Sequence, residues 1–308
     1  MRPLDRLRAN IQSCFLGNQA AIDRVVICLL ARGHVLIEDV PGVGKTTLAL
    51  ALARSLDVEL GRVQMTPDLM PSDVLGVNIW DADLKTFTFR PGPVFANLVL
   101  ADEVNRTTPR TQSALLEAMS EAQVTLDGET RKLPDPFMVI ATQNPFEFEG
   151  TYFLPESQLD RFLMRINLGY PSPEDEARVL THDPRRHALR ELDAVLDAEG
   201  LRELQYRCDH ARIDPALVAY IVALADATRR SDQLQLGVSP RGSLALLRVA
   251  RAAAVLQDRD YVVPDDITAL VVPVFAHRCL GRDTAADGDA ASTKRVLQGI
   301  LERVPMPV

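Results

Sequence analysis

The chain has 308 residues, of which 47% are hydrophobic and 25% charged, a composition that excludes disordered, collagen-like and disulfide-scaffold proteins. Its formal net charge is −8, and neither half has the basic excess typical of non-specific nucleic-acid binding, so we do not expect a nucleic-acid partner. No apolar run reaches the ~18 residues of a membrane-spanning helix and no signal peptide is recognised, so we expect a cytoplasmic protein without a membrane span.

Residues 1–170 alternate short apolar runs with helical patterns, which is typical of an α/β fold. Strands are expected at the runs 34–39, 62–65, 97–101, 137–142 and 163–168. Two β-hairpins interrupt this alternation, one near residues 76–90 around a polar turn and one near residues 123–133 around Asp127-Gly128.

The pattern changes at Tyr170-Pro171-Ser172-Pro173, because closely spaced prolines end regular structure. The residues that follow are rich in Ala, Leu and Arg and predict helices at 174–181, 187–198, 215–229, 241–256, 265–275 and 293–304. We therefore predict two domains, an α/β domain over residues 1–170 and a helical domain over residues 171–308.

A glycine-containing loop follows the first expected strand and precedes a helical pattern, which is the context of a phosphate-binding loop. Its glycines let backbone N–H groups approach phosphate oxygens, and the helix N-terminus favours negative charge. Lys45 is expected to reach the β- and γ-phosphates, and the Thr46 hydroxyl to hold Mg²⁺. Asp39 stands where this loop usually has its first glycine. The candidate nucleotide-binding residues here are Pro41, Gly42, Val43, Gly44, Lys45, Thr46 and Thr47.

Polar side chains end two further apolar runs. Asp102 and Glu103 follow the run at 97–101, and Asn144 follows the run at 137–142. In a phosphate-loop ATPase Asp102 would hold Mg²⁺ through water, and Glu103 would act as the general base on the attacking water. Asn144 could hydrogen-bond both the γ-phosphate and that water.

Taken together, these segments resemble the AAA+ ATPases, and among them the MoxR family of the helix-2-insert group. The resemblance spans about residues 10–305 and is carried by Glu38–Thr47, Ala101–Arg106 through Glu117–Met119, Ala141–Pro145, Gly150–Phe162 and Gly237–Gly242. It implies a P-loop NTPase fold in which an αβα core with a five-stranded parallel sheet precedes an all-α lid.

The resemblance also implies residue roles. Lys45 and Thr46 resemble the Walker A motif, Asp102 and Glu103 the Walker B motif, and Asn144 the sensor 1 residue. The segment Phe15–Gln19, with Gly17 at its centre, is similar to the one that borders adenine. The hairpins near 76–90 and 123–133 resemble the helix-2 insert and the pre-sensor-1 hairpin.

Two arginines of the later segments complete this set. Arg161 resembles an arginine finger that reaches the site of a neighbouring subunit, and Arg241 resembles sensor 2. Arg106, Arg110 and Arg165 remain alternatives for the contact in trans. A finger that acts in trans leaves a monomer's site incomplete, so the resemblance implies a homo-oligomeric ring, a hexamer.

The function implied is that of an ATP-hydrolysing, chaperone-like remodeller that binds ATP or ADP with Mg²⁺. The resemblance further implies a protein client with a von Willebrand A domain. Three alternatives stay open from the sequence, namely the ATPase subunit of a magnesium-chelatase-like enzyme, a nucleic-acid motor, and a nucleotide-binding switch that hardly hydrolyses ATP, against which the presence of Asp102 and Glu103 argues.

Overall fold

The computed structural model describes residues 2–145, 151–182, 188–282 and 290–307, so Gly150 of the motif Gly150–Phe162 lies outside the described residues. Contacts divide the chain into two compact units. Unit 1 consists of Met1–Asp23, His34–Leu154 and Ile166–Leu201, and unit 2 of Arg24–Gly33, Pro155–Arg165 and Arg202–Val308. The sequence predicts a domain boundary near residue 171. In the structure, the contacts of residues 171–201 group them with unit 1.

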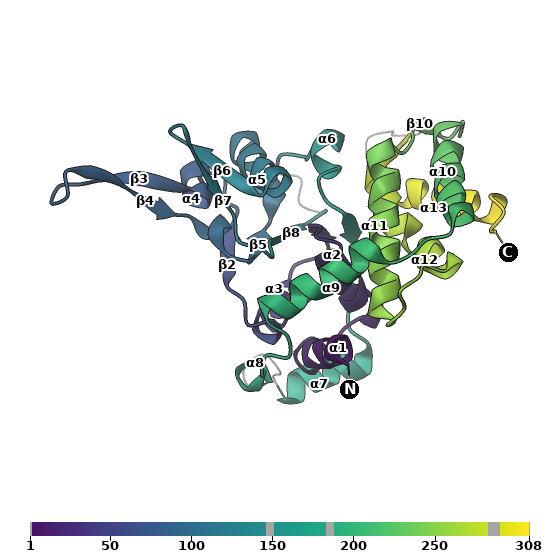
Figure 1. Ribbon diagram of the computed structural model, residues 1–308, viewed down its shortest axis with the longest axis horizontal. Helices are drawn as coiled ribbons and strands as arrows, with labels where there is room; N and C mark the ends of the chain where they lie inside the picture. Colours follow the sequence, from purple (N-terminus) through teal and green to yellow (C-terminus); the bar gives the residue numbers. More distant parts are fainter. Residues whose placement is uncertain (1, 146–150, 183–187, 283–289, 308) are drawn as a thin grey trace. The chain divides into compact units, whose positions relative to one another are not determined.

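A five-stranded parallel sheet has the strand order β2-β5-β8-β1-β9, and Figure 1 labels its strands β2, β5 and β8. Its strands fall on the predicted runs and are β1 (Val35–Glu38), β2 (Leu60–Gln64), β5 (Leu98–Asp102), β8 (Met138–Gln143) and β9 (Met164–Ile166). Every residue of β5 is buried, because both faces of a parallel sheet are covered by helices. The α/β fold with a five-stranded parallel sheet is therefore confirmed.

The register brings the carboxyl ends of three strands to one edge of this sheet. Glu38 of β1 pairs with Gln143 of β8, and Ala101 of β5 pairs with Ala141 of β8. Residues that directly follow β1, β5 and β8 therefore lie close together, which is where ligands bind in open α/β sheets.

The helices of unit 1 differ in the apolar surface that they bury: the first buries Leu4, Leu7 and Ile11, whereas no residue of 173–181 is buried. They are α1 (Pro3–Cys14), α3 (Lys45–Ser55), α4 (Pro71–Leu75), α5 (Pro109–Glu121), α7 (Pro173–His182) and α8 (Ala188–Glu191), with the 3₁₀ turns η1 (Pro93–Phe95) and η2 (Val104–Arg106). Helices α2 (Gln19–Leu30) and α9 (Ala198–His210) each begin in unit 1 and end in unit 2.

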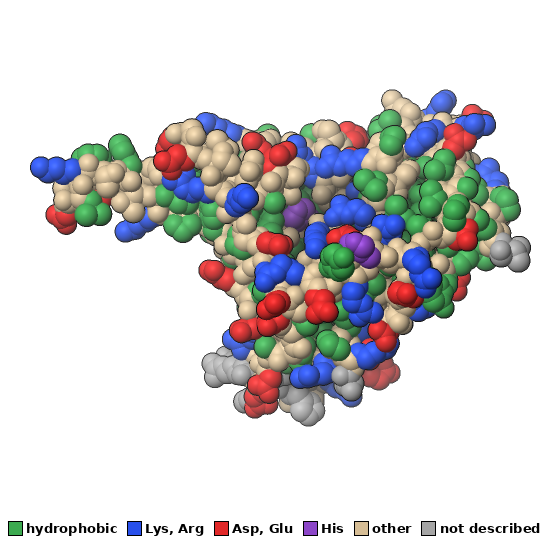
Figure 2. All heavy atoms as spheres, in the orientation of Figure 1, with side chains coloured by type: hydrophobic (Ala, Val, Ile, Leu, Met, Phe, Trp, Pro, Cys, Tyr) green, Lys and Arg blue, Asp and Glu red, His purple; other side chains and the backbone are tan. Residues whose placement is uncertain are grey.

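Both predicted hairpins are present, as β3 (Gly76–Asp81) with β4 (Thr86–Pro91) and β6 (Gln123–Leu126) with β7 (Glu129–Lys132). The β3–β4 hairpin extends away from the sheet (Figure 1), and hydrophobic side chains are exposed along it (Figure 2). Trp80 and Phe87 pack edge to face at 5.2 Å between ring centroids, yet each remains more than half exposed.

Unit 2 is mostly helical, as predicted for the second half of the chain. Its helices are α6 (Glu156–Leu159), α10 (Pro215–Arg229), α11 (Pro240–Leu256), α12 (Pro264–Phe275) and α13 (Ala290–Arg303), with the turn η3 (Ala276–Arg278). A short antiparallel pair, β10 (Leu234–Leu236) and β11 (Leu280–Gly281), accompanies them. In the described part of the chain, no helix combines the length and apolarity needed to cross a membrane.

Candidate nucleotide-binding site

The phosphate loop connects the end of β1 to the start of α3. Gly42 and Gly44 have φ angles of +89° and +96°, in the left-handed region that favours glycine. Gly44 is the N-cap of α3. Because glycine has no side chain, no side-chain hydrogen bond caps this helix. The first N–H groups of α3 are thus available to an anion, with the helix dipole adding a favourable potential.

Asp39, which replaces the usual first glycine of this loop, ties two segments of unit 1 together. Its Oδ1 accepts a hydrogen bond from the N–H of Val40 at 2.9 Å. Its Oδ2 accepts hydrogen bonds from the N–H groups of Leu168 and Gly169, both at 2.8 Å. The carboxylate therefore fixes the chain after β9 to the start of the phosphate loop, a contact that glycine could not make.

Restoring the usual glycine is expected to destabilise the protein. Asp39→Gly leaves the Leu168 and Gly169 N–H groups without their acceptor, which should cost about 2 kcal/mol in free energy of unfolding. Asp39→Asn retains one acceptor oxygen and should lose less. Urea unfolding followed by circular dichroism measures both variants, and a glycine variant as stable as the original chain would contradict this account of Asp39.

Lys45 begins α3 and points back to the loop. Its Nζ donates a hydrogen bond to the carbonyl oxygen of Asp39 at 2.6 Å. Burial lowers the pKa of the Lys45 ammonium, while the negative charges of Asp39, Asp102 and Glu103 oppose this shift. Since these carboxylates act on the lysine electrostatically, the fold gathers the predicted Walker A and Walker B side chains at one end of the sheet.

The carboxylate of Asp102 is buried and held in position by two partners. Thr142 of β8 donates its hydroxyl to Oδ1 at 3.1 Å, and Arg62 of β2 donates Nη2 to Oδ2 at 3.0 Å. The Thr142 hydroxyl also accepts the N–H of Glu103 at 2.9 Å. One threonine thereby orients both acidic residues.

Glu103 differs from Asp102 in conformation and in partners. Its φ of +59° lies in the left-handed region, which turns the chain sharply after β5. Its Oε2 accepts hydrogen bonds from Gln64 Nε2 at 2.9 Å and from Arg106 Nη1 at 3.1 Å. Two side chains therefore hold the Glu103 carboxylate. To activate a water molecule, the carboxylate would have to exchange one of these hydrogen bonds for a hydrogen bond with the water.

The supporting residues Arg62, Gln64 and Thr142 were missed by the sequence analysis. Gln64 pairs in register with Asp102 across β2 and β5, and this neighbourhood is created by the sheet order. Thr142 carried a weak signal, because it is a polar residue at the end of the apolar run that precedes Asn144.

Asn144 follows β8, which lies between β1 and β5 in the sheet. It is buried, and its backbone carbonyl accepts a hydrogen bond from Asn105 Nδ2 at 3.5 Å. The strand order therefore places Asn144 directly after β8, the strand between β1, which leads into the phosphate loop, and β5, which leads into the two acidic residues.

A cavity of about 310 Å³ adjoins the phosphate loop and is mainly apolar in its lining. Lining residues include Phe15, Leu16, Val43, Thr47, Tyr170 and Leu180. Gly17 packs against the Phe15 ring, where a Cβ would lie 2.6 Å from the ring edge, so the glycine lets the ring turn toward the loop. The size and the apolar walls suit a nucleotide base, and α7 contributes a wall that the sequence analysis missed.

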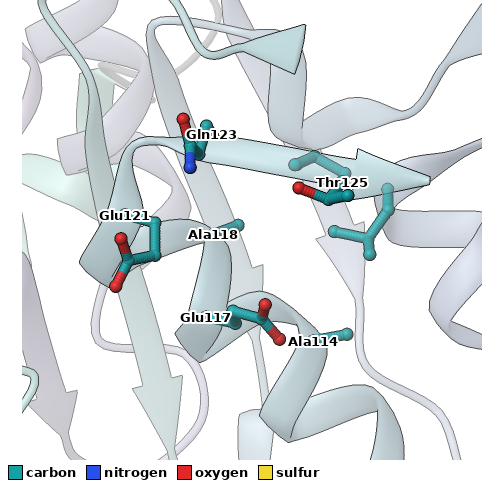
Figure 3. Close-up of a pocket in the computed structure, with 8 residues that line it drawn as sticks. Ala114, Glu117, Ala118, Glu121, Gln123 and Thr125 are labelled. Carbon is teal, nitrogen blue, oxygen red and sulfur yellow. The ribbon is translucent and has the colours of Figure 1, made fainter. Parts of the chain in front are cut away.

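A second cavity, of about 80 Å³, lies between α5 and β6. Figure 3 shows Glu117 and Glu121 of α5 beside it, with Gln123 and Thr125 of β6 opposite. None of the predicted site residues lines this cavity. We therefore assign the candidate nucleotide site to the larger cavity and the phosphate loop.

The predicted residues Arg161 and Arg241 belong to unit 2, whereas the phosphate loop, Asp102, Glu103 and Asn144 belong to unit 1. Arg161 follows α6 in the turn that leads to β9. Arg241 lies in the first turn of α11, with its Nε 3.7 Å from Asp160 Oδ2. Their roles toward a nucleotide remain predictions.

Comparison with known proteins finds relatives over nearly the whole chain. Residues 34–164 match the family described as "ATPase family associated with various cellular activities (AAA)", and residues 226–300 match an AAA lid domain. The chain is 50% identical to Uncharacterized protein YeaC of Bacillus subtilis, over 97% of this chain and 93% of that protein. It is 40% identical to Chaperone MoxR1 of Mycobacterium tuberculosis, over 99% of this chain and 82% of that protein.

A solved structure of a candidate ATPase from Cytophaga hutchinsonii also has the same fold. It superposes with a TM-score of 0.90 at 35% sequence identity, and the match covers 99% of this chain and 95% of that one. Both units of the present chain therefore have counterparts in a single known structure.

Proposed function

Because this chain belongs to the MoxR family of AAA+ ATPases, we propose that it hydrolyses ATP to ADP and phosphate at the phosphate loop of unit 1. The observation that carries the proposal is the grouping of Lys45, Asp102 and Glu103 beside the uncapped N-terminus of α3, where the two carboxylates oppose the lowering of the Lys45 pKa by burial. A lysine, a metal-binding carboxylate and a base at the end of a parallel sheet are the groups that phosphoryl transfer to water needs.

Different residues of the chain bind the phosphates, bind the base and activate the attacking water. The N–H groups of residues 42–47 and the Lys45 ammonium bind the phosphates, and the cavity beside Phe15 takes the base. Glu103 accepts the proton of the attacking water after releasing Gln64 or Arg106, and Asn144 orients that water and the γ-phosphate.

The residues present also fit a magnesium ion. Thr46 is the second residue of α3, and the Asp102 carboxylate lies near enough to Lys45 to affect its pKa. Mg²⁺ held by Thr46 and Asp102 would supply the positive charge that stabilises the negative charge developing on the phosphates. Thr142 and Arg62 orient the Asp102 carboxylate for this contact.

We propose further that Arg161 completes the site of a neighbouring subunit and that Arg241 contacts the nucleotide of its own subunit. This division makes the protein a homo-oligomeric ring, for which we propose a hexamer in the cytoplasm. The name of its relative Chaperone MoxR1 supports a chaperone-like action on a protein client. We propose a von Willebrand A domain protein as that client, on the family resemblance.

The nucleotide site is tested by comparing Lys45→Ala with Lys85→Ala, since Lys85 is an exposed lysine in the turn between β3 and β4. Loss of one charged hydrogen-bond donor to phosphate should weaken ATP affinity by about 10- to 100-fold in Lys45→Ala. Isothermal titration with Mg²⁺–ATP measures the affinity. Equal affinity for both variants would contradict the assignment of the loop.

A further inference from the structure

A buried arginine of unit 2 holds the turn that carries Arg161. Arg278 is 7% exposed, and its Nε donates to Asp160 Oδ1 at 2.7 Å. Its Nη2 donates to the carbonyl oxygen of Phe162 at 2.7 Å, and its Nη1 to that of Leu163 at 3.2 Å. One guanidinium thus binds residues on both sides of Arg161, so the placement of Arg161 depends on η3 of unit 2.

Asp160 has a second cationic partner, the Arg241 side chain that we propose to contact nucleotide. Arg241 Nε lies 3.7 Å from Asp160 Oδ2, while Arg278 occupies Oδ1. Both arginines therefore share one carboxylate. Burial and the positive charge of Arg241 both lower the pKa of Arg278, and the Asp160 carboxylate opposes them.

The two arginines differ in how firmly they are held. The side chain of Arg278 is 4% exposed, whereas that of Arg241 is 59% exposed and makes the longer contact. Gly242, the residue after Arg241, packs on Arg278 so closely that a Cβ would lie 2.9 Å from its Cδ. Arg278 is therefore fixed beneath the first turn of α11, and Arg241 is the partner that can leave Asp160 for another anion.

We propose that Asp160 is a positioning residue that couples Arg241 to Arg161, with Asp160 and the phosphates of bound nucleotide competing for Arg241. When Arg241 turns to the nucleotide, the Asp160 carboxylate keeps Arg278 but loses its second cationic partner among the described residues, so the turn before Arg161 carries less positive charge. Nucleotide binding in one subunit thereby changes the surroundings of Arg161, the arginine that serves the neighbouring site. The inference rests on the proposed function, in which Arg241 acts in its own subunit and Arg161 in trans.

The substitution Asp160→Asn distinguishes this coupling from a purely structural role of Asp160. The asparagine can still accept the hydrogen bond of Arg278 Nε but no longer holds Arg241 by charge. Without the competition from Asp160, ATP should bind more tightly. The gain should be only about 2- to 5-fold, because an exposed ion pair such as Arg241–Asp160 contributes little free energy. The loosened turn should also lower kcat at saturating ATP by about 10-fold, since small displacements of a catalytic group are costly.

The experiment measures Mg²⁺–ATP affinity of the full chain in a Glu103→Gln background, which prevents hydrolysis, and kcat with Glu103 intact. Asp226→Asn is the matched control, because it breaks an exposed ion pair between Asp226 of α10 and Arg230, which directly follows that helix in the same unit. We expect its affinity and kcat to equal those of the unmodified chain. Thermal unfolding of each variant checks that the fold is retained.

The double variant Asp160→Asn/Arg241→Ala decides the mechanism, since the tightening should vanish once Arg241 is absent. An Asp160→Asn affinity equal to that of the unmodified chain, a tightening that persists without Arg241, or an unchanged kcat would each overturn the coupling. Failure of the proposed function would look different, because the unmodified chain would then not bind or hydrolyse ATP at all.

Discussion

Arg161→Ala is expected to lower ATP turnover by about 10³- to 10⁵-fold, the largest effect of any single substitution in this chain. An arginine finger stabilises the charge that develops on the transferring phosphoryl group, and this stabilisation exists chiefly in the transition state. ATP affinity should therefore change far less than kcat. Steady-state hydrolysis with Mg²⁺, together with ATP titration of the same variant, separates the two quantities.

Mixing two inactive variants tests whether Arg161 acts in trans. Arg161→Ala retains Glu103, and Glu103→Gln retains Arg161, so a mixed ring contains interfaces at which one complete site forms. We expect activity to reappear on mixing. If Arg161→Ala stays active while Arg106→Ala, Arg110→Ala or Arg165→Ala is inactive, the finger is that other arginine.

Glu103→Gln is expected to lower turnover by about 10²- to 10⁴-fold, because the amide cannot accept the proton of the attacking water. The substitution keeps the shape of the side chain and an oxygen that can accept hydrogen bonds from Gln64 and Arg106. ATP should therefore still bind and remain uncleaved. Hydrolysis measured by phosphate release, beside titration with Mg²⁺–ATP, shows whether binding and chemistry separate.

Glu59→Gln provides the matched control for this substitution. Glu59 is an exposed carboxylate that precedes β2, at the opposite end of that strand from Gln64. The same chemical change should leave turnover there as in the unmodified chain. Comparable turnover in the two variants would mean that Glu103 is not the general base.

Most strands of the sheet could be predicted from the sequence because they are short runs of buried apolar residues, whereas in β2 only Val63 is buried. All residues of β5 are buried, and the first five of β8 are buried as well. Their order in the sheet could not be predicted, because it depends on which strands pair in three dimensions. For this reason the roles of Arg62 and Gln64 beside Asp102 and Glu103 became visible only in the structure.

The predicted helix over residues 187–198 is confirmed at 188–191 and at residue 198, and is wrong for residues 192–197. The structure has the short helix α8 (Ala188–Glu191), then an irregular segment, and α9 begins at Ala198. In the irregular segment the N–H groups of Val195 and Leu196 both point to the carbonyl oxygen of Ser55, at 2.9 and 3.3 Å. Long-range hydrogen bonds thus replace the local ones that the helical composition favours.

Within the candidate site, the sequence predicted the groups that carry chemistry but not those that orient them. These groups lie at the ends of strands or loops with recognisable patterns: Asp102 ends β5, Glu103 and Asn144 directly follow strands, and Lys45 directly follows the phosphate loop. Arg278 carries no such signal, because it lies 118 residues from its partner Asp160 and meets it only through the fold of unit 2.

The central claim, an ATPase whose sites are completed by neighbouring subunits, is tested most directly by ATP hydrolysis at increasing protein concentration with Mg²⁺ present. We predict that activity per subunit rises with concentration as rings assemble and then levels off. Hydrolysis that is absent, or that is the same per subunit at every concentration across the range in which the protein assembles, would contradict the account.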